Sequence, residues 1–305
     1  MRDRTTGSGE GGGAISNPLA GGKPYYSGPM SERMRDLLLI SVGNSRTRCA
    51  IAAAGELQPS VYLPNEELAT LPERLRASAD AASDDLRAII ASVNDPVARQ
   101  VEEILEGAKD LPVTGTALRM GRDVPIPVEH TLPAPVTVGQ DRLLNALGAF
   151  SRSEQACIVI DAGTAVTVDF VDGHGVFQGG AIAPGVRMML RALHEHTAAL
   201  PEVTLSPANL PGRGGEGDKG REPWGKTTAA AMTLGVVAAV RGLAHELIDR
   251  YAEHYEAYPR VVATGGDAPL LFDGDALVEH IVPDLTLIGM LAACRIALEA
   301  DTEED

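Results

Sequence analysis

The stretch Ile158-Val159-Ile160-Asp161-Ala162-Gly163-Thr164-Ala165-Val166-Thr167-Val168-Asp169 decides the fold of this 305-residue chain. Its apolar first part predicts a buried strand, and the alternation from Val166 to Val171 predicts a second strand. The turn between them would present Asp161, Gly163 and Thr164 at the tip of a hairpin. Such a tip suits a phosphate, because glycine lets the backbone N–H approach, threonine adds a hydroxyl donor and aspartate can hold a cation nearby. An ordinary glycine-containing turn is the alternative explanation.

A second copy of this pattern lies 120 residues earlier. There the apolar run Leu37–Ile40 leads into Ser41-Val42-Gly43-Asn44-Ser45, and alternation resumes at Cys49. The residues of the two tips correspond in order, Ser41 with Asp161, Gly43 with Gly163 and Asn44 with Thr164. Two similar half-domains explain the repetition economically, each offering a hairpin to a shared cleft. That arrangement is similar to the acetate-kinase, sugar-kinase and Hsp70-ATPase superfamily; a chance match between two hydrophobic hairpins is the alternative.

Net charge and composition exclude several classes of function. The chain has a net charge of −16, no lysine- or arginine-rich run and only 4% aromatic residues, so neither nucleic acid nor an anionic membrane is an expected partner. We expect no membrane-spanning segment and no signal peptide. Cys49, Cys157 and Cys294 are far apart in apolar segments, which predicts reduced core thiols and a cytoplasmic protein.

The chain divides by composition into four parts. We expect a disordered tail over residues 1–36, half-domains over 37–150 and 151–298 and an acidic tail over 299–305. Strand and helix patterns alternate in both halves, which predicts an α/β fold of two actin-like or ribonuclease H-like half-domains with a nucleotide cleft between them. The expected elements are helices over 64–87, from 97, over 138–150, through 188–193, from Thr227 and over 286–298, and strands over 86–93 and 260–264. Residues 121–137 and 206–223 are expected to be loops.

Two further positions are candidates for chemistry. Asp141 falls in the first turn of the helix expected over 138–150, where the helix dipole favours a carboxylate in any case; the functional interpretation is a general base held by the scaffold. Gly265 and Gly266 follow the strand expected over 260–264. A glycine pair there would let adenosine lie against bare backbone, although a turn leading into a helix has the same composition.

Taken together, segments in a fixed order resemble the type III pantothenate kinases, over about residues 37 to 298. The segments that carry the resemblance are Gly139-Gln140-Asp141-Arg142, Asp161-Ala162-Gly163-Thr164, Thr197-Ala198-Ala199-Leu200-Pro201 and Thr264-Gly265-Gly266, with the first hairpin tip before them. The resemblance implies ATP-dependent phosphorylation of pantothenate to 4′-phosphopantothenate, the first step of coenzyme A biosynthesis. It also implies Mg²⁺, a monovalent cation (K⁺ or NH₄⁺) and a homodimer whose second subunit helps to complete the pantothenate pocket.

The resemblance assigns roles to particular residues. Asp141 would be the base that accepts the hydroxyl proton, and Asp161 would bind the monovalent cation. Pantothenate would contact Gly139, Gln140, Asp141, Arg142 and Thr197; ATP would contact Gly43, Asn44, Ser45, Arg48 and Thr164 at its phosphates and Gly265 and Gly266 at its adenosine.

Two positions depart from the family pattern. Ser41 stands where the family has an aspartate that coordinates Mg²⁺, and Leu132, three residues before Pro135, stands where it has a tyrosine. Loss of a carboxylate removes a strong ligand for a hard cation. One hypothesis is therefore an active kinase whose Mg²⁺ is held mainly by the ATP phosphates. The alternatives are a non-catalytic protein that binds nucleotide or pantothenate, and a kinase for a different small hydroxylated acid.

Overall fold

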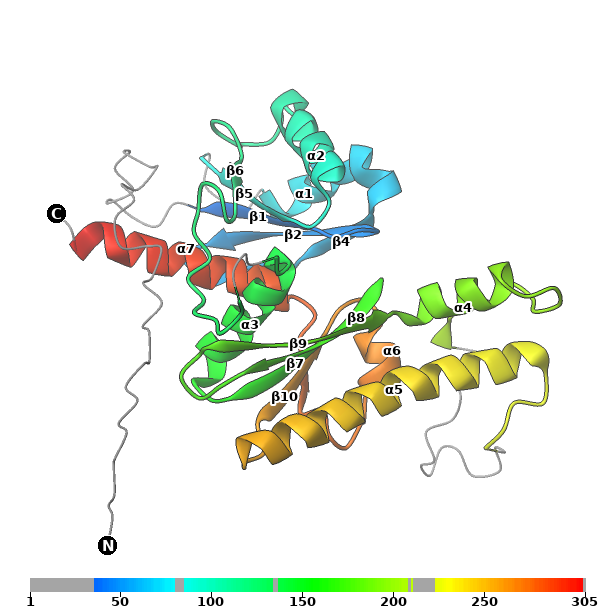
Figure 1. Cartoon of the computed structure of the whole chain (residues 1–305). Helices are drawn as coiled ribbons and strands as arrows, with labels where there is room; N and C mark the ends of the chain where they lie inside the picture. Colours follow the sequence, from blue (N-terminus) through cyan, green and yellow to red (C-terminus); the bar gives the residue numbers. More distant parts are fainter. Residues whose placement is uncertain (1–35, 80–84, 134–136, 208–209, 211–222, 304–305) are drawn as a thin grey trace, which may run out of the picture.

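Two separate β-sheets form the framework of the molecule (Figure 1), and their strands follow corresponding orders. The structure is a computed structural model, and it describes residues 36–79, 85–133, 137–207, 210 and 223–303. The expected tail, apart from Asp36, and most of the expected loop at 206–223 lie outside the described residues.

The first sheet has the order β3-β2-β1-β5-β6, with β4 also paired to β2. Its strands are β1 (Leu37–Val42), β2 (Arg46–Ala53), β3 (Glu56–Leu57), β4 (Val61–Pro64), β5 (Arg87–Ser92) and β6 (Leu118–Arg119). The second sheet has the order β11-β10-β7-β8-β9. Its strands are β7 (Cys157–Ala162), β8 (Ala165–Val171), β9 (Phe177–Pro184), β10 (Arg260–Thr264) and β11 (His280–Ile281).

The two sheets are built by the same rule. Each starts with an antiparallel hairpin, β1–β2 or β7–β8, whose first strand then pairs in parallel with β5 or β10. A short parallel strand, β6 or β11, follows at the edge. The same order of antiparallel and parallel pairings in both halves confirms the prediction of a duplicated α/β half-domain.

Helices cover both faces of each sheet in layers (Figure 1). The helices are η1 (Asn65–Thr70, a 3-10 helix), α1 (Leu71–Ala79), α2 (Asp95–Gly107), α3 (Gln140–Ser153), α4 (Val186–Glu195), α5 (Thr228–Tyr255), α6 (Ala268–Phe272) and α7 (Leu285–Glu303). Side chains of β1 alternate between two cores: Leu38 and Ile40 pack with α1 and α2, whereas Leu37 and Leu39 pack with α7. In β7, Ile158 and Ile160 likewise pack on the α5 side.

The helices α3 and α7 lie between the two sheets and touch each other through glycine. A Cβ on Gly148 would lie 2.6 Å from the carbonyl oxygen of Leu285, and one on Gly289 would overlap the backbone of Leu144. Only glycine permits so close an approach of two helix backbones. The C-terminal helix α7 thus packs on the first sheet although it follows the second in the chain, and it continues to Glu303 rather than ending at residue 298.

The helix α5 corrects one expectation. It spans 28 residues, and its mean hydropathy of 1.4 over 18 residues makes it long and apolar enough, by length and composition, to cross a membrane. No segment of this length and hydropathy was expected from the sequence. The helix is apolar because one side packs on the second sheet, through buried residues that include Val236, Val240, Ala244 and Ile248. A helix in the core of a globular protein can have the same length and mean hydropathy as a membrane-spanning helix.

Other expectations need smaller adjustments. The helical pattern over 64–87 forms η1 and then α1, which ends at Ala79; Leu86 bridges to Val113 and β5 begins at Arg87. The proline-rich residues 121–133 form no regular strand and are tied to the sheets by single bridges. All three cysteines are buried free thiols, as predicted, and burial raises the pKa of Cys49 to about 12.

Candidate active site

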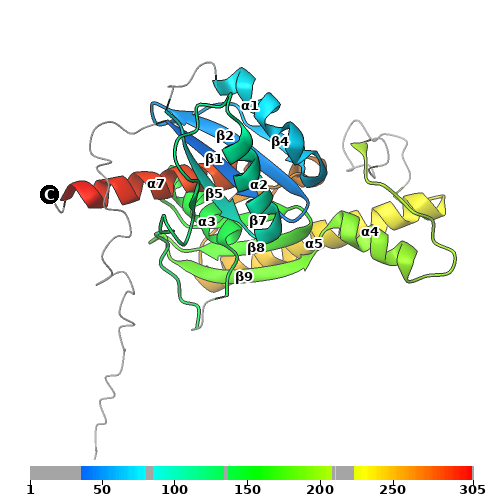
Figure 2. The same cartoon turned by 90° about the horizontal axis from the view of Figure 1, so that it is seen from above.

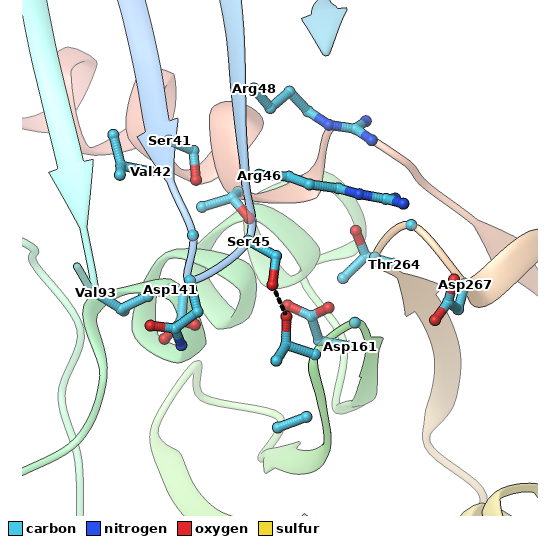
Figure 3. Close-up of a pocket in the computed structure, with 18 of the residues that line it drawn as sticks. Ser41, Val42, Ser45, Arg46, Arg48, Val93, Asp141, Asp161, Thr264 and Asp267 are labelled. Carbon is cyan, nitrogen blue, oxygen red and sulfur yellow. Dashed lines mark hydrogen bonds between the residues drawn. The ribbon is translucent and has the colours of Figure 1, made fainter. Parts of the chain in front are cut away.

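A cleft of about 500 Å³ lies between the two halves, where both hairpin tips meet. Residues singled out from the sequence line it, among them Ser41, Gly43, Asn44, Ser45, Arg48, Asp141, Asp161, Gly163, Thr164, Gly265 and Gly266. They come from β1, β2, α3, β7 and the segment after β10, far apart in the sequence. Figure 3 shows the carboxylates of Asp141 and Asp161 on one side of this space, with Arg46 and Arg48 on the other.

The two hairpin tips have the same internal hydrogen bond and touch each other. The Gly43 N–H donates to the Arg46 carbonyl, and the Gly163 N–H donates to the Ala165 carbonyl, both at 2.9 Å. The first tip is one residue longer, because Val42 pairs with Thr47 whereas Ala162 pairs with Val166. The Ser45 and Thr164 hydroxyls lie 3.0 Å apart and form a hydrogen bond (Figure 3).

Asp141 occupies the first turn of α3, after Gly139 as the N-terminal cap. Its Oδ1 accepts a hydrogen bond from the Arg142 N–H at 2.8 Å, and a Cβ on Gly139 would lie 2.5 Å from that oxygen. The predicted substrate contact Gly139 therefore has a steric role: a side chain there would collide with the Asp141 carboxylate. Burial raises the pKa of Asp141 above its ordinary value, which makes the carboxylate a better proton acceptor.

Asp161, at the end of β7, forms a second acidic group in the cleft. Burial and the nearby negative charge of Asp141 raise the pKa of Asp161 to about 6. Sequence reasoning missed Asn145, whose side-chain amide donates to Asp161 Oδ2 at 3.0 Å. The available signal was its position four residues after Asp141, on the same face of a helix.

The remaining predicted substrate contacts lie outside the residues that line this cleft. Gln140 ties α3 to the first sheet, since its amide donates to the Met120 carbonyl at 2.9 Å. Arg142 forms an ion pair with the buried Asp169, with Nε donating to both carboxylate oxygens at 3.1 Å. Thr197 is exposed beyond α4, where its hydroxyl donates to the Leu193 carbonyl at 2.7 Å.

Leu132, the departure at the family tyrosine position, is partly buried in an apolar cluster with Val138, Leu143 and Phe150. Its Cδ2 atom would be 3.3 Å from a Cβ on Gly179, so it packs against β9. It does not line the cleft.

Arginines form the basic side of the cleft, and Arg48 is the one among them that was expected by name to contact ATP. The Arg48 guanidinium pairs with Asp284 at 2.6 Å and also lies over the Tyr62 ring. Arg46 also lies over the Tyr62 ring, 5.0 Å from its centroid. Arg187, at the start of α4, pairs with the buried Asp267 at 2.5 Å. Guanidinium groups of this kind bind phosphate oxygens.

Gly265 and Gly266 pass directly over the second hairpin. Gly265 has a φ of +91°, and a Cβ there would lie 2.4 Å from the Ala162 carbonyl oxygen and 2.5 Å from Asp161 Oδ1. The Asp267 N–H fixes the segment to β7 by donating to the Ala162 carbonyl at 2.9 Å. The glycine pair therefore places backbone at the wall of the cleft.

Oxygen ligands for a cation are present but few. In the part of the chain that the structure describes, no group of three or more His, Cys, Asp or Glu side chains could hold a metal ion. The carboxylate of Asp161 suits a hard cation such as K⁺ or Mg²⁺, whereas Ser41 offers only a hydroxyl. A divalent ion would therefore depend on ligands that a bound substrate brings with it.

The duplicated fold, the twin tips, the basic wall and the buried carboxylates define a class: ATP-dependent phosphotransferases that act on a small molecule. The sequence profile of type III pantothenate kinases matches residues 37–250. The type III pantothenate kinase of Akkermansia muciniphila is 32% identical over 263 residues, which cover 86% of this chain and 99% of that protein. That of Dehalococcoides mccartyi is 32% identical over 262 residues, covering 83% and 93% of the two chains. The chain belongs to the type III pantothenate kinase family.

A structural comparison accompanies these matches. The solved activator of 2-hydroxyisocaproyl-CoA dehydratase from Clostridium difficile, with bound ADPNP, has a TM-score of 0.47 and 12% identity, covering 88% of this chain and 96% of that one. Family membership makes the protein an enzyme, a phosphotransferase with an alcohol group as acceptor, which uses ATP and a divalent metal. No observation favours the non-catalytic alternative.

Proposed function

We propose that the cleft transfers the γ-phosphoryl group of ATP to the primary hydroxyl of pantothenate, with Asp141 as the proton acceptor. The observation that carries this proposal is the presence of the Asp141 carboxylate in the same cleft as both hairpin tips. A general base must lie within reach of the hydroxyl it deprotonates, and the phosphate must lie in line with that hydroxyl. The cleft has Asp141 and Asp161 on one side and Arg46 and Arg48 on the other. This distribution of charge supports a hydroxyl near the acids and phosphates near the arginines.

The nucleotide is expected along the twin tips and the glycine pair. Backbone N–H groups and the hydroxyls of Ser45 and Thr164 would donate to phosphate oxygens, with Arg48 close by. Adenosine would lie against the backbone of Gly265 and Gly266, which line the cleft. These donors would stabilise the charge that develops on the transferring phosphoryl oxygens, once the Ser45 and Thr164 hydroxyls exchange their mutual hydrogen bond for phosphate oxygens.

The proton step follows from the position of Asp141. The pantothenate hydroxyl oxygen forms a bond to the γ-phosphorus while the bond to the β–γ bridging oxygen breaks, so that ADP leaves with the bridging oxygen. The hydroxyl proton passes to the Asp141 carboxylate. Positioned bases of this kind contribute roughly 10²–10⁴ in rate.

Two cations complete the proposed site. Mg²⁺, held by ATP phosphates and water near Ser41, would neutralise charge on the phosphoryl oxygens. A monovalent cation, K⁺ or NH₄⁺, would bind at Asp161, whose carboxylate lies in the cleft. The family resemblance supports both assignments; Asp161 supplies a carboxylate oxygen for the monovalent cation, whereas Mg²⁺ would take most of its ligands from ATP.

We also propose a cytoplasmic homodimer. Figures 1 and 2 show α4 and the first part of α5 extending beyond the second sheet. Thr197, exposed beyond α4, would reach pantothenate in the other subunit rather than in its own. Light scattering of the purified protein tests the dimer, and Thr197→Ala should raise the KM for pantothenate without changing the KM for ATP.

A coupled kinase assay with pantothenate tests the proposed function. Wild-type protein should form ADP and 4′-phosphopantothenate, identified by mass spectrometry, and Asp141→Asn should lower kcat by roughly 10²-fold or more. Asp110→Asn, which changes an acid with a 72% exposed side chain, is the matched control and should leave kcat unchanged. ATP binding without product would favour the non-catalytic alternative, and a panel of other hydroxylated acids would reveal a different acceptor.

A further inference from the structure

A hydrogen-bond chain links Asp161 and Thr286, which both line the cleft, through the buried amide of Asn145. Asn145 is 1% exposed in a part of α3 that is otherwise apolar, from Leu144 to Ala149. A buried amide destabilises a protein unless both of its ends find partners. Both ends of Asn145 do so: Nδ2 donates to Asp161 Oδ2 at 3.0 Å, and Oδ1 accepts from the Thr286 hydroxyl at 2.7 Å.

Rigid elements hold the three members of this chain. Asn145 lies on α3, Asp161 is the penultimate residue of β7 and Thr286 is the second residue of α7. The close contact of α3 and α7 through Gly148 and Gly289 fixes the two helices against each other. Sites supported by packed helices and strands are more precise than sites on loops. Because Asn145 follows Asp141 by one helical turn, one helix carries Asp141 and also contacts Asp161.

The direction of the hydrogen bonds has a chemical consequence. The Thr286 hydroxyl donates to the amide oxygen, so the NH₂ end of Asn145 faces the carboxylate of Asp161. That bond holds Oδ2 and leaves Oδ1 for a cation. Oδ1 lies on the side of Gly265, where a Cβ would be 2.5 Å from it and 2.4 Å from the Ala162 carbonyl oxygen. Asp161 Oδ1 and the Ala162 carbonyl oxygen thus both face the backbone of Gly265.

We propose that Asn145 is a positioning residue that fixes the Asp161 carboxylate for a monovalent cation, and that Thr286 fixes the orientation of Asn145. This inference rests on the proposed role of Asp161 in binding a cation. It goes beyond that role by naming the two residues that orient the Asp161 carboxylate. Residues that orient a ligand in this way commonly change metal affinity about 10–100-fold when mutated.

The test uses Thr286→Val, which keeps the shape of threonine and removes its hydroxyl, and Asn145→Leu, which removes the amide. Thr233→Val is the matched control, because Thr233 also lies in a helix and its hydroxyl donates to a carbonyl oxygen, that of Ala229, four residues earlier. Binding of Tl⁺, a spectroscopic substitute for K⁺, is followed by ²⁰⁵Tl NMR on the full chain without substrates. The K⁺ concentration for half-maximal rate is measured separately at constant ionic strength.

We expect Thr286→Val to weaken Tl⁺ binding and to raise the half-maximal K⁺ concentration, each by about tenfold, with the KM for pantothenate within twofold at saturating K⁺. Thr286→Ser should have the wild-type affinity for Tl⁺ and the wild-type half-maximal K⁺ concentration. Asn145→Leu should abolish the NMR signal of bound Tl⁺. Folded Thr286→Val protein with wild-type Tl⁺ and K⁺ responses would overturn the proposal, as would a wild-type enzyme that is active but indifferent to K⁺ and Tl⁺. Absence of product from wild-type protein that still binds Tl⁺ would instead count against the proposed function alone.

Discussion

The hydroxyls of Ser45 and Thr164 meet at 3.0 Å, joining the tips of two hairpins that occupy corresponding places in the two halves of the chain. Both residues line the cleft, and both follow a glycine whose N–H closes the tip. The contact links the halves at the place where a phosphate would enter between them. Each hydroxyl can therefore exchange its partner across the cleft for a phosphate oxygen.

Removal of the Thr164 hydroxyl should weaken ATP binding. A hydrogen bond to a charged group contributes about 1.5–3 kcal/mol, so we expect Thr164→Val to raise the KM for ATP by about tenfold or more. Thr164→Ser keeps the hydroxyl and should stay close to wild type. Initial rates at varied ATP and saturating pantothenate give both values. Equal KM values for the valine and serine variants would show that the hydroxyl does not contact the nucleotide.

Replacement of Gly265 by alanine should destabilise the fold and the site together. Its φ of +91° is strained for alanine, and the new Cβ would overlap the Ala162 carbonyl and Asp161 Oδ1. Such strain amounts to about 1–3 kcal/mol in the free energy of unfolding, measured by urea denaturation. Gly235→Ala on α5 is the control, since a Cβ there meets nothing within 4 Å and alanine favours helix by about 1 kcal/mol. A Gly265→Ala protein as stable as wild type would contradict the interpretation.

Periodicity and internal repetition were sufficient to predict the framework. The alternation of apolar residues on both sides of Gly43 and Gly163 defines two hairpins, and their regular spacing implies equivalent positions in a duplicated fold. Helix ends were harder to predict. The helical pattern expected over 64–87 overlaps the strand expected over 86–93, because alanines and leucines precede Leu86. The bridge of Leu86 to Val113 shows that pairing decides the structure of this residue.

Partners distant in the sequence explain most of what could not be predicted at the site. Arg142 matches a substrate-binding motif, yet its ion pair is with Asp169, on a strand of the second sheet. The contact of Asn145 with Thr286 joins residues 141 positions apart. No local pattern encodes such pairs, because they arise only when the helices α3 and α7 pack between the sheets.

The pH dependence of stability should reveal Asp161. Its pKa is raised to about 6 by burial and by Asp141, so the folded protein binds this proton more tightly than the unfolded chain does. By linkage, this stabilisation is present at low pH and is lost as the pH rises through about 6, by about 1–3 kcal/mol. Asp161→Asn should therefore lose activity while its free energy of unfolding falls less between pH 5 and 7.5, measured in urea without K⁺. Asp110→Asn should keep the wild-type slope, and an equally steep fall in Asp161→Asn would refute the assignment.

A carboxylate at position 41 should strengthen the binding of divalent metal. Ser41 lines the cleft at the end of β1 and takes the place that an aspartate holds in the family pattern. Carboxylate oxygens bind Mg²⁺ far better than a neutral hydroxyl does. We therefore expect Ser41→Asp to lower the half-saturating Mg²⁺ concentration by about three- to tenfold, since one added ligand charge at an ion pair distance contributes about 1 kcal/mol in a wet cleft. Ser41→Asn has the same size without the charge and separates electrostatics from sterics. If both variants need as much Mg²⁺ as wild type, then the metal does not approach residue 41, and the ATP phosphates alone hold it.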